Sequence, residues 1–516
     1  MPGRSALVSA ALTAATVATA SSPAPLARPD AVTIASGAGP TLVRVLDNDD
    51  AGSPGSRLSV VAVTQPAHGT VAIAAGGLGV VYTPAAGFTG RDTFTYTASN
   101  ALQAVRVPSS IIGEYGGTPI LDGYGSALAP IPGAPDEFYL LTDRGPTVDG
   151  PSGTKIVALK SFTPHIGRFR LADGALSLLS TIVLKDADGH PRSGLDEANG
   201  IDAEGLVALP DGTFWISDEY GPYLLHVDGT GRTLEQVSPH AANARGHKLP
   251  AVLARRVSNK GMEGLTVTPD GLRLVGIMQA SLANGISERE AKSTPTVRIV
   301  TYDLAGRAEG TTHQYLYLLD DPATTGVGVS EIAAVSNTEL LVDERDARFP
   351  GDPENPSRVK RLYRISLDGA TDVSDAGDPA TGRLVRGSTI EALTAGLTRS
   401  AARDRLREQG IAAVSKTLEV DLLAELSRVG ALGTLYPHDK IEGLAVVDSG
   451  RRIVLSNDND FGVDGTRPPS KRLVAKTIPT PPRETDYTSL LIVDLANLPA
   501  TPATATVTVS VGAPAR

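Results

Sequence analysis

The sequence predicts an all-β protein that combines a β-propeller with a small immunoglobulin-like β-sandwich. A short motif recurs four times between residues 204 and 460, and repeats at this spacing are typical of radial or solenoid β architectures. Residues 31–101 alternate polar and apolar side chains between turn signals, as the strands of a small sandwich do. The 54 glycines and 37 prolines suit a chain with many tight turns.

Each copy of the motif predicts one β-hairpin. An apolar run follows the motif, a polar pair forms the turn, and a second apolar run ends in polar residues. Residues 125–146 follow the same plan with a looser turn. Because propeller blades hold four strands, we expect six blades between residues 110 and 498, with five as the minimum and seven as the maximum. The four copies begin at Glu204-Gly205-Leu206, Glu263-Gly264-Leu265, Ser330-Glu331-Ile332 and Glu442-Gly443-Leu444.

The turn signals predict which residues pair across each hairpin. Asp211-Gly212 is a strong two-residue turn signal, and a turn there pairs Glu204 with Glu219. Each hairpin therefore places its opening Glu and its closing polar residues at one end, and in a propeller these ends gather on one rim of the central channel. The corresponding pairs in the other hairpins are Glu263 with Met278, Glu331 with Glu344, and Glu442 with Asn457.

Residues 388–429 interrupt the repeat between its third and fourth copies. Residues 401–408 carry the clearest helical pattern in this segment. We therefore expect the segment to lie outside the blades, as a lid.

The first 30 residues predict a signal peptide followed by a linker. Arg4 precedes a weakly apolar run over residues 6–20, which ends in the small-residue sequence Ala18-Thr19-Ala20 that suits cleavage. The alternative is an Ala- and Pro-rich tail without this role. The run is too short to span a bilayer, and no later segment is long and apolar enough to do so.

The closing strand of the sandwich has two candidates. Residues 503–511 form a Thr- and Val-rich alternating run at the far end of the chain, and residues 103–107 offer a shorter alternative. If residues 501–516 complete the sandwich, the propeller is an insertion into it. Such insertions are tolerated where the ends of a domain lie close together.

Several motifs occur in a fixed order along the chain. They are Thr142-Asp143-Arg144-Gly145, Asp202-Ala203-Glu204-Gly205-Leu206, Ser217-Asp218-Glu219-Tyr220-Gly221-Pro222, Asn259-Lys260-Gly261-Met262-Glu263-Gly264-Leu265, Lys440-Ile441-Glu442-Gly443-Leu444 and Ser456-Asn457-Asp458-Asn459-Asp460-Phe461. Through them, the chain from about residue 110 to residue 498 resembles the phytase-like domain family, also called "esterase-like activity of phytase". This resemblance implies that Glu and Asp residues carry a phosphatase- or phytase-like chemistry. The N-terminal module resembles the immunoglobulin-like and cadherin-like repeats of bacterial surface and secreted proteins.

Composition and missing motifs exclude several classes of function. The net charge of −10 argues against nucleic acid or an anionic membrane as a partner. The chain has no cysteine, and it contains no Gly-x-Ser-x-Gly, Walker or His-Glu-x-x-His motif. Of the eight histidines, only His438 lies beside a copy of the motif, and its role is either functional or structural.

The predicted rim combines carboxylates with cations, which suits a phosphate held between a hard metal ion and basic side chains. Ca²⁺ takes several oxygen ligands, which Asp, Glu and Asn supply; another divalent metal is the alternative. The carboxylates could instead bond backbone amides, and the cations could simply form ion pairs. The candidate catalytic residues are Glu204, Glu263, Glu442, Arg144, Lys260 and Lys440. The candidate metal ligands are Asp143, Asp218, Glu219, Glu331, Asp343, Glu344, Asn457 and Asp458.

These features together predict an exported, metal-dependent hydrolase of small phosphoric esters, of the phytase or phosphodiesterase type. One alternative is another metal-dependent propeller hydrolase, such as a lactonase. A second is a non-enzymatic surface module that binds protein or glycan. We expect a secreted, periplasmic or cell-surface bacterial protein whose sandwich contacts the cell surface or the extracellular matrix, with no nucleic-acid partner and no membrane span.

Overall fold

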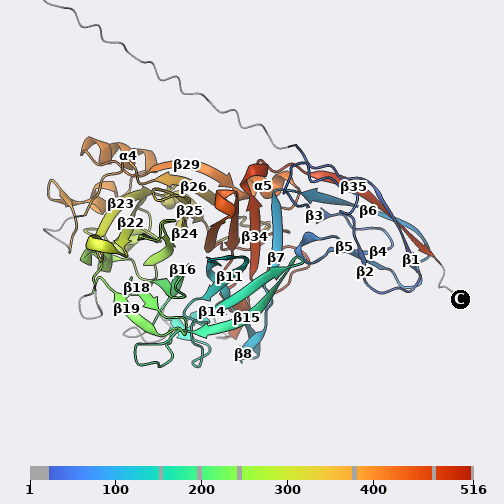
Figure 1. Cartoon of the computed structure of the whole chain (residues 1–516), viewed down its shortest axis with the longest axis horizontal. Coiled ribbons are helices and arrows are strands. Elements are labelled where there is room, and N and C mark those ends of the chain that lie inside the picture. Colours follow the sequence, from blue (N-terminus) through green and yellow to red (C-terminus); the bar gives the residue numbers. More distant parts are fainter. Residues whose placement is uncertain are drawn as a thin grey trace, which may run out of the picture.

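The computed structural model describes residues 23–149, 155–194, 200–240, 247–374, 380–467 and 472–512. Within these ranges the chain forms a β-propeller and a β-sandwich that lie side by side (Figure 1). The predicted signal peptide falls largely on residues 1–22, which lie outside the described residues. The all-β prediction, with a propeller and an immunoglobulin-like module, is confirmed.

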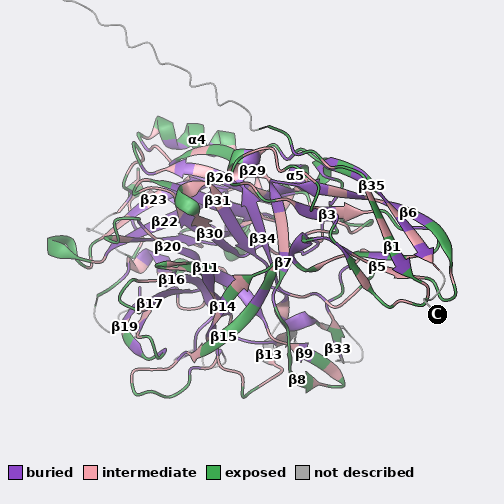
Figure 2. Ribbon diagram, turned by 45° about the vertical axis from the view of Figure 1, so that its right-hand side comes forward, coloured by how far each residue is buried: buried purple, intermediate pink, exposed green. Residues whose placement is uncertain are grey.

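The first strands of the blades form a closed ring around the channel. These strands contact one another in the order β10, β16, β20, β24 and β30, and β30 contacts β10 again. Their bounds are β10 (Tyr124–Ile131), β16 (Ala203–Ala208), β20 (Met262–Val267), β24 (Gly328–Ala334) and β30 (Gly443–Val447). Four of them, β10, β16, β20 and β24, are largely buried, as Figure 2 shows for β16 and β20.

Each first strand begins a four-stranded antiparallel sheet, and the described residues form five such sheets. The first blade continues with β11 (Ala134–Thr142), β14 (His165–Ala172) and β15 (Ala175–Val183). The second continues with β17 (Phe214–Asp218), β18 (Leu224–Val227) and β19 (Thr233–Val237). The third continues with β21 (Arg273–Met278), β22 (Thr296–Asp303) and β23 (Thr312–Leu318). The fourth continues with β25 (Glu339–Arg345), β26 (Lys360–Ser366) and β29 (Ser415–Asp421), and the fifth with β31 (Arg452–Ser456), β34 (Ser489–Asp494) and β7 (Leu102–Arg106).

The propeller has five blades where six were expected, because the two ends of the domain share one blade. The strand β7 precedes the first blade in the sequence, yet it pairs antiparallel with β34, the third strand of the fifth blade. Through this pairing β7 becomes the fourth strand of the fifth blade, so it is not part of a sixth blade. Residues 103–107, the shorter candidate for the closing strand of the sandwich, therefore lie mainly in the propeller.

The segment 388–429 contains helices, but the prediction that all of it lies outside the blades is wrong. Its helices are α3 (Ile390–Thr394), α4 (Arg399–Glu408) and α5 (Leu422–Arg428). Between them, β29 forms the outer edge of the fourth blade, with Glu419 bonded to Arg364 of β26 at 2.8 Å. The polar composition of this edge strand resembles that of the flanking helices and hides its strand character. The helices α3 and α4 pack on β22 and β23, away from the channel.

The sandwich consists of two sheets with an apolar core between them. One sheet has the order β1-β35-β6-β3, and the other has the order β2-β5-β4. The strand β35 (Ala503–Gly512) runs parallel to β1 and antiparallel to β6, so the far end of the chain lies inside the sandwich (Figure 1). The remaining strands are β1 (Asp30–Ala35), β2 (Thr41–Val43), β3 (Ser59–Val63), β4 (Gly69–Ile73), β5 (Val80–Pro84) and β6 (Gly90–Ser99).

Short hairpins and helices decorate the propeller. Three of the hairpins gather around Phe461, whose ring packs with Ile120, Val463 and Leu473. These are β8 (Ile111–Tyr115) with β9 (Thr118–Leu121), β12 (Thr147–Asp149) with β13 (Lys155–Val157), and β32 (Val463–Arg467) with β33 (Arg472–Ala475). Elsewhere lie the pair β27 (Leu384–Val385) with β28 (Ser388–Thr389), and the short helices α1 (Glu288–Ala291) and α2 (Pro322–Thr325).

Candidate functional site

A polar cavity of about 220 Å³ lies where the first strands of the blades begin. Most of its lining side chains are charged, so the cavity differs from an ordinary apolar ligand pocket. We call this end of the channel the acidic mouth. Its lining residues are Asp143, Arg144, Gly145, Thr147, Glu204, Glu219, Asn259, Lys260, Glu263, Gln279, Arg345, Lys440, Glu442, Asp458, Asp460 and Phe461.

The Glu residues of the motif reach the cavity from the very start of each first strand. In the second blade, Ala203 pairs with Asp218 and Gly205 pairs with Ser217, which leaves Glu204 as the extra residue of a β-bulge. Glu263 occupies the same kind of bulge in the third blade. A bulge re-aims a side chain, and bulges are common beside functional sites. The predicted pairing of Glu204 with Glu219 is therefore replaced by a bulge that turns both side chains to the cavity.

The glycine after each Glu lets the first strands of neighbouring blades approach one another. A Cβ atom on Gly264 would lie 2.6 Å from the amide nitrogen of Ile332, in the next blade. A Cβ atom on Gly443 would lie 2.9 Å from the amide nitrogen of Leu128. Real Cβ atoms do not approach so closely, so only glycine fits at these positions. The Glu of the motif thus lines the cavity, and the glycine after it lets neighbouring first strands come close enough to close the ring.

The third copy of the motif is shifted by one residue, and this shift removes Glu331 from the site. The bulge lies between Val329 and Glu331, so Ser330 occupies the position of the cavity-facing Glu. Glu331 occupies the glycine position instead, and its carboxylate accepts hydrogen bonds from the amides of Leu265 at 2.8 Å and Ile332 at 2.9 Å. The structure does not bring Glu331 to the cavity, contrary to the expectation for a metal ligand.

A second ring of side chains comes from the ends of the second strands. In each blade, the motif glycine or its equivalent in the first strand pairs with a residue of the second strand. The side chain two positions after that residue lines the cavity. The five equivalent residues are Asp143, Glu219, Gln279, Arg345 and Asp458. This ring contains three of the predicted metal ligands, Asp143, Glu219 and Asp458.

The residues just before this ring point away from the cavity, because side chains alternate along a strand. Asp218 accepts a hydrogen bond from the amide of Asp202 at 2.8 Å. Glu344 accepts one from the Tyr317 hydroxyl at 2.6 Å. Asn457 accepts one from the amide of Ser489 at 2.7 Å. These three predicted metal ligands have structural partners outside the cavity. The expected register was wrong by one residue in the second and fourth blades, whereas in the fifth blade Gly443 pairs with Ser456 as expected and Asn457 still lies outside the cavity lining.

Asp343 is also absent from the cavity lining. Both of its carboxylate oxygens are buried and have no hydrogen-bond partner among the described residues. Burial raises the pKa of Asp343 to about 8, although Arg345 and Lys360 oppose the shift. The structure therefore does not bring Asp343, a predicted metal ligand, to the cavity.

The cavity holds more carboxylates than cations, and most of the cations are paired. Arg144 forms an ion pair with Asp202, and Arg345 forms one with Glu442. Lys440 lies 2.9 Å from Asp458 and 2.6 Å from Asp460. The lining carboxylates are Asp143, Glu204, Glu219, Glu263, Glu442, Asp458 and Asp460, against the four cations Arg144, Lys260, Arg345 and Lys440.

Lys260 differs from the other three cations. Its ammonium group donates to the amide oxygen of Gln279 at 2.6 Å, and no described carboxylate lies within ion-pair distance of it. Burial lowers the pKa of Lys260, although Glu263 and Glu219 oppose this effect. Lys260 is thus the lining cation with the most freedom to bind an anionic ligand.

Glu204 is the least compensated carboxylate of the acidic mouth. It is 8% exposed, and no described residue gives it a hydrogen bond or an ion pair. Burial, together with the charges of Asp202 and Glu263, raises the pKa of Glu204 well above its usual range. Burial likewise raises the pKa of Glu263 to about 8 and that of Glu442 to about 7. A cation in the cavity would relieve this repulsion.

One set of carboxylates, made up of the lining residues Asp143 and Glu204 and the fully buried Asp202 beside them, has the spacing that a metal ion needs. Ligand oxygens of Asp143, Asp202 and Glu204 all lie within 4.8 Å of one another. Hard divalent cations such as Ca²⁺ bind such oxygen sets. Glu219 also belongs to this end of the cavity, and its Oε1 atom is buried without a partner among the described residues.

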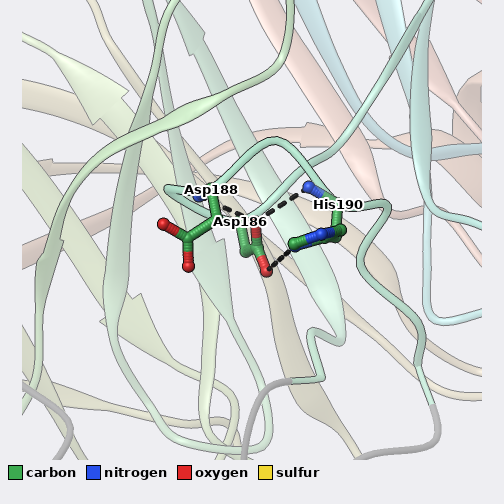
Figure 3. A group of neighbouring side chains, drawn as sticks. All are labelled: Asp186, Asp188 and His190. Atoms are coloured by element: carbon green, nitrogen blue, oxygen red, sulfur yellow. Dashed lines mark hydrogen bonds and ion pairs between the residues drawn. The ribbon is translucent and has the colours of Figure 1, made fainter.

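A second acidic group, Asp186, Asp188 and His190, lies in a loop (Figure 3). The Oδ1 atom of Asp186 accepts hydrogen bonds from the amides of Asp188 and His190, both at 2.9 Å. Its Oδ2 atom lies 3.4 Å from Nδ1 of His190, whose side chain is 77% exposed. These bonds hold the loop in shape, and the group offers no buried, unpartnered ligand.

Sequence reasoning missed four lining or supporting residues. Asp202 and Asp460 stand two residues from Glu204 and Asp458, inside the same motifs, and this proximity in the sequence could have revealed them. Gln279 would have followed from its equivalence to Glu219. Asn259, whose amide oxygen accepts from Arg144 at 2.6 Å, left no signal beyond its place beside Lys260.

His438 does not line the acidic mouth. It is fully buried in the fifth blade, between Asp486 and Ser489. The described residues include no helix that is long and apolar enough to cross a membrane.

Comparisons with solved structures give only weak likenesses. A luciferin-regenerating enzyme matches with a TM-score of 0.30 and 9% identity, covering 92% of this chain and 100% of that one. An α-L-arabinofuranosidase from Podospora anserina matches with a TM-score of 0.33 and 8% identity, covering 76% of this chain and 96% of that one. At these scores neither likeness carries an argument, and the fold rests on the strand pairing described above.

Sequence comparisons are more informative. An uncharacterized secreted protein of Arthroderma benhamiae is 28% identical over 338 residues, which are 49% of this chain and 64% of that protein. The family described as "Esterase-like activity of phytase" matches residues 121–461, and the bacterial Ig domain family matches residues 22–107. The first match includes all the residues that line the acidic mouth. The chain therefore belongs to the phytase-like family and carries a bacterial immunoglobulin-like domain on its N-terminal side.

Proposed function

We propose that this protein is a metal-dependent hydrolase of phosphoric esters that acts at the acidic mouth. The observation that carries the proposal is the uncompensated carboxylate of Glu204, which lies in one cavity with six further carboxylates and four cations. Such a set is costly to bury without a ligand. Membership of the phytase-like family supports a hydrolase.

The residues that would hold the metal ion are Asp143, Asp202 and Glu204, with Glu219 beside them. Their oxygen atoms suit Ca²⁺ first, and another hard divalent ion second. When bound, such an ion would neutralise the carboxylates and polarise a phosphoryl oxygen. The spacing of the three carboxylates and the unpartnered oxygen of Glu219 support this fit.

The cations of the cavity would bind the phosphoryl group of the substrate. Lys260, which bonds Gln279 and has no carboxylate partner among the described residues, offers the positive charge of its ammonium group for this purpose. Arg144 and Arg345 are held in place by Asp202 and Glu442, so their positions need little reorganisation when an anion binds. The cavity volume of about 220 Å³ favours the entry of a single phosphoryl group with a small part of its ester.

Glu263 and Glu442 would move protons. Because their pKa values lie at about 8 and about 7, both carboxyl groups can hold a proton near neutral pH. A protonated carboxyl group can donate its proton to the leaving alkoxide, and the resulting carboxylate can accept one from the attacking water. The amide of Gln279 donates to Glu263 and would keep that carboxyl group in position.

The proposal includes export. The relative from Arthroderma benhamiae is named a secreted protein, and the small-residue sequence at residues 18–20 suits cleavage of a signal peptide. We place the mature protein in the periplasm, at the cell surface or in the medium, with the immunoglobulin-like domain available for surface contacts.

The test compares phosphate release with lactone opening. The purified chain is assayed on phytate, p-nitrophenyl phosphate, bis-p-nitrophenyl phosphate and a set of lactones, each with Ca²⁺ and with EDTA. We expect phosphate release with Ca²⁺ and none with EDTA, and a loss of this activity in Glu204→Gln but not in Asp188→Asn. Lactone opening without phosphate release would replace the proposal by a lactonase, and no turnover of either class would favour a binding module.

A further inference from the structure

A serine, a histidine and an aspartate form a hydrogen-bonded chain in the fifth blade. The Oγ atom of Ser489 lies 2.7 Å from Nε2 of His438. The Nδ1 atom of His438 lies 2.7 Å from Oδ1 of Asp486. A serine nucleophile, a histidine base and an orienting carboxylate have this order and these distances in unrelated hydrolases, which are recognised by geometry and not by sequence position.

The surroundings fix the imidazole ring and its tautomer. The rings of Tyr436 and Tyr487 meet the His438 ring edge to face, at centroid distances of 4.9 and 5.0 Å. Asp486 also accepts the amide of Tyr487 at 3.0 Å, which holds the carboxylate in place. Its Oδ2 atom lies 3.3 Å from the ammonium group of Lys476. Because the Asp486 carboxylate can only accept, Nδ1 of His438 carries the proton and Nε2 is left to accept the Ser489 hydroxyl.

Ser489 lines a cavity of about 540 Å³ that separates the sandwich from the propeller. Ser489 stands directly opposite Arg106 in the β34–β7 pair, so both side chains leave the same face of the blade. Arg106 lines this cavity too, and its guanidinium group lies 3.6 Å from the centroid of the Tyr487 ring. Ser489 is itself 3% exposed, as a nucleophile at the floor of a pocket would be. The sandwich supplies the far wall through Val60 and residues 73–77.

We propose that Ser489, His438 and Asp486 form a second hydrolytic site, one that cleaves small carboxylic esters bound between the sandwich and the propeller. None of the three residues lines the acidic mouth, so this site is separate from the proposed phosphoesterase centre. Apolar side chains of the cavity, among them Val60, Leu176 and Leu435, suit a short acyl chain.

The reaction balances without a metal ion or a cofactor. The Oγ atom of Ser489 attacks the ester carbonyl while Nε2 of His438 takes the hydroxyl proton. The bond from the carbonyl carbon to the alcohol oxygen then breaks, and the alcohol leaves with that proton. Water repeats the sequence on the acyl-serine, releases the carboxylic acid and restores the Ser489 hydroxyl, while Asp486 stabilises the imidazolium in both halves.

The first test labels the wild-type chain with a fluorophosphonate probe in the presence of EDTA and maps the modified peptide by mass spectrometry. We expect the probe on Ser489. Because this measurement needs no variant, it does not depend on how a substitution affects folding. A chain without the adduct at Ser489 would overturn the proposal and leave the three residues as a buried structural network.

The second test measures hydrolysis of p-nitrophenyl acetate with EDTA present. We expect Ser489→Ala and His438→Gln to lower the rate by at least about 100-fold, because both the nucleophile and the base are needed. The control is Ser180→Ala, which changes an exposed serine of β15 that does not line this cavity. Folded Ser489→Ala protein with the wild-type rate would refute the site. Since the phosphoesterase proposal requires a metal ion, insensitivity to EDTA separates the two activities.

Discussion

The five first strands run between two mouths of the propeller channel that have opposite chemistry. Residues at or just before the starts of these strands, together with residues at the ends of the second strands, form the acidic mouth, with its seven lining carboxylates. The last residues of the first strands line a cavity of about 300 Å³ that is mostly apolar, with Leu128, Leu206, Leu265 and Leu444 among its residues. We call this second end the apolar mouth.

The contrast shows which part of the strand sequence serves the fold and which part serves a ligand. Leucine after the motif glycine packs between the blades in every Glu-Gly-Leu copy, as a propeller core requires. Burial of a carboxylate gives the fold no such gain, and Glu204, Glu263 and Glu442 all carry raised pKa values because burial disfavours their charge. The acidic mouth thus costs the fold stability that the apolar mouth does not, which is a mark of a functional site.

The largest effect expected at the acidic mouth is the loss of catalysis. Glu204→Gln keeps the size of the side chain and removes its charge, so we expect phosphoesterase activity to fall by at least about 100-fold. The control Asp188→Asn changes an exposed carboxylate of the other acidic group and should leave activity intact. Rates are measured with saturating Ca²⁺ by phosphate release. Equal rates in the two variants would show that Glu204 is not part of the active site.

A metal ion should stabilise the folded chain through the acidic mouth alone. At a Ca²⁺ concentration of 100 times Kd, binding adds about 2.7 kcal/mol to the free energy of unfolding. We expect EDTA to lower the melting temperature and added Ca²⁺ to restore it, with the response blunted in Glu204→Gln. Differential scanning calorimetry measures both. A melting temperature that changes with neither Ca²⁺ nor EDTA would count against a metal site.

The motif glycine should matter for stability more than for chemistry. In Gly264→Ala the new methyl group would lie 2.6 Å from the amide of Ile332, and such overpacking costs about 1–3 kcal/mol of unfolding free energy. The control is Gly39→Ala in the sandwich, where a Cβ atom meets nothing within 4 Å. Urea denaturation compares the two variants. Equal stability would show that the blades can separate enough to admit a side chain.

The apo protein should lose stability as the pH rises from about 5 to 8. Glu263 has a pKa of about 8 in the folded state and an ordinary value near 4.5 when unfolded, so the folded state binds more protons in this range. The free energy of unfolding therefore falls with rising pH. The ion pairs that lower the pKa of Asp460 change the free energy of unfolding only at more acidic pH, so they do not offset this trend. Glu263→Gln or Ca²⁺ should flatten the slope, measured by urea denaturation at pH 5 and 8 in EDTA, and a slope that stays unchanged would contradict this account.

Removal of the C-terminal strand should have the smallest effect on either mouth. We propose that residues 31–101, closed by residues 501–516, fold as one unit and that residues 110–498 fold as another. No described residue of the sandwich lines either mouth. Deleting residues 501–516 should destabilise the sandwich, because β35 lies between β1 and β6, and leave the Ca²⁺ response in place. If the melting temperature of the truncated chain, measured by calorimetry, no longer responds to Ca²⁺, the division into two folding units is contradicted.

The sequence alone was enough to predict the propeller, its hairpins and much of the acidic mouth. The motif at Glu204, Glu263 and Glu442 is visible because short-range periodicity and turn residues set a hairpin locally. The predicted cations Arg144, Lys260 and Lys440 also line the cavity, since they stand within a few residues of strand ends. These features depend on neighbours in the chain, which a sequence displays directly.

Only the tertiary structure decided which carboxylates face one another. Bulges at Glu204 and Glu263 and the one-residue shift at Ser330 depend on contacts between blades, and a shift of one residue turns a side chain to the opposite face of its strand. The same is true of β7, which reaches the fifth blade from the other end of the domain, and of β29, whose polar sequence hides an edge strand. Pairings between distant segments leave no local pattern, so the blade count, the ligand set and the Ser489–His438–Asp486 chain emerged only when the strands were assembled.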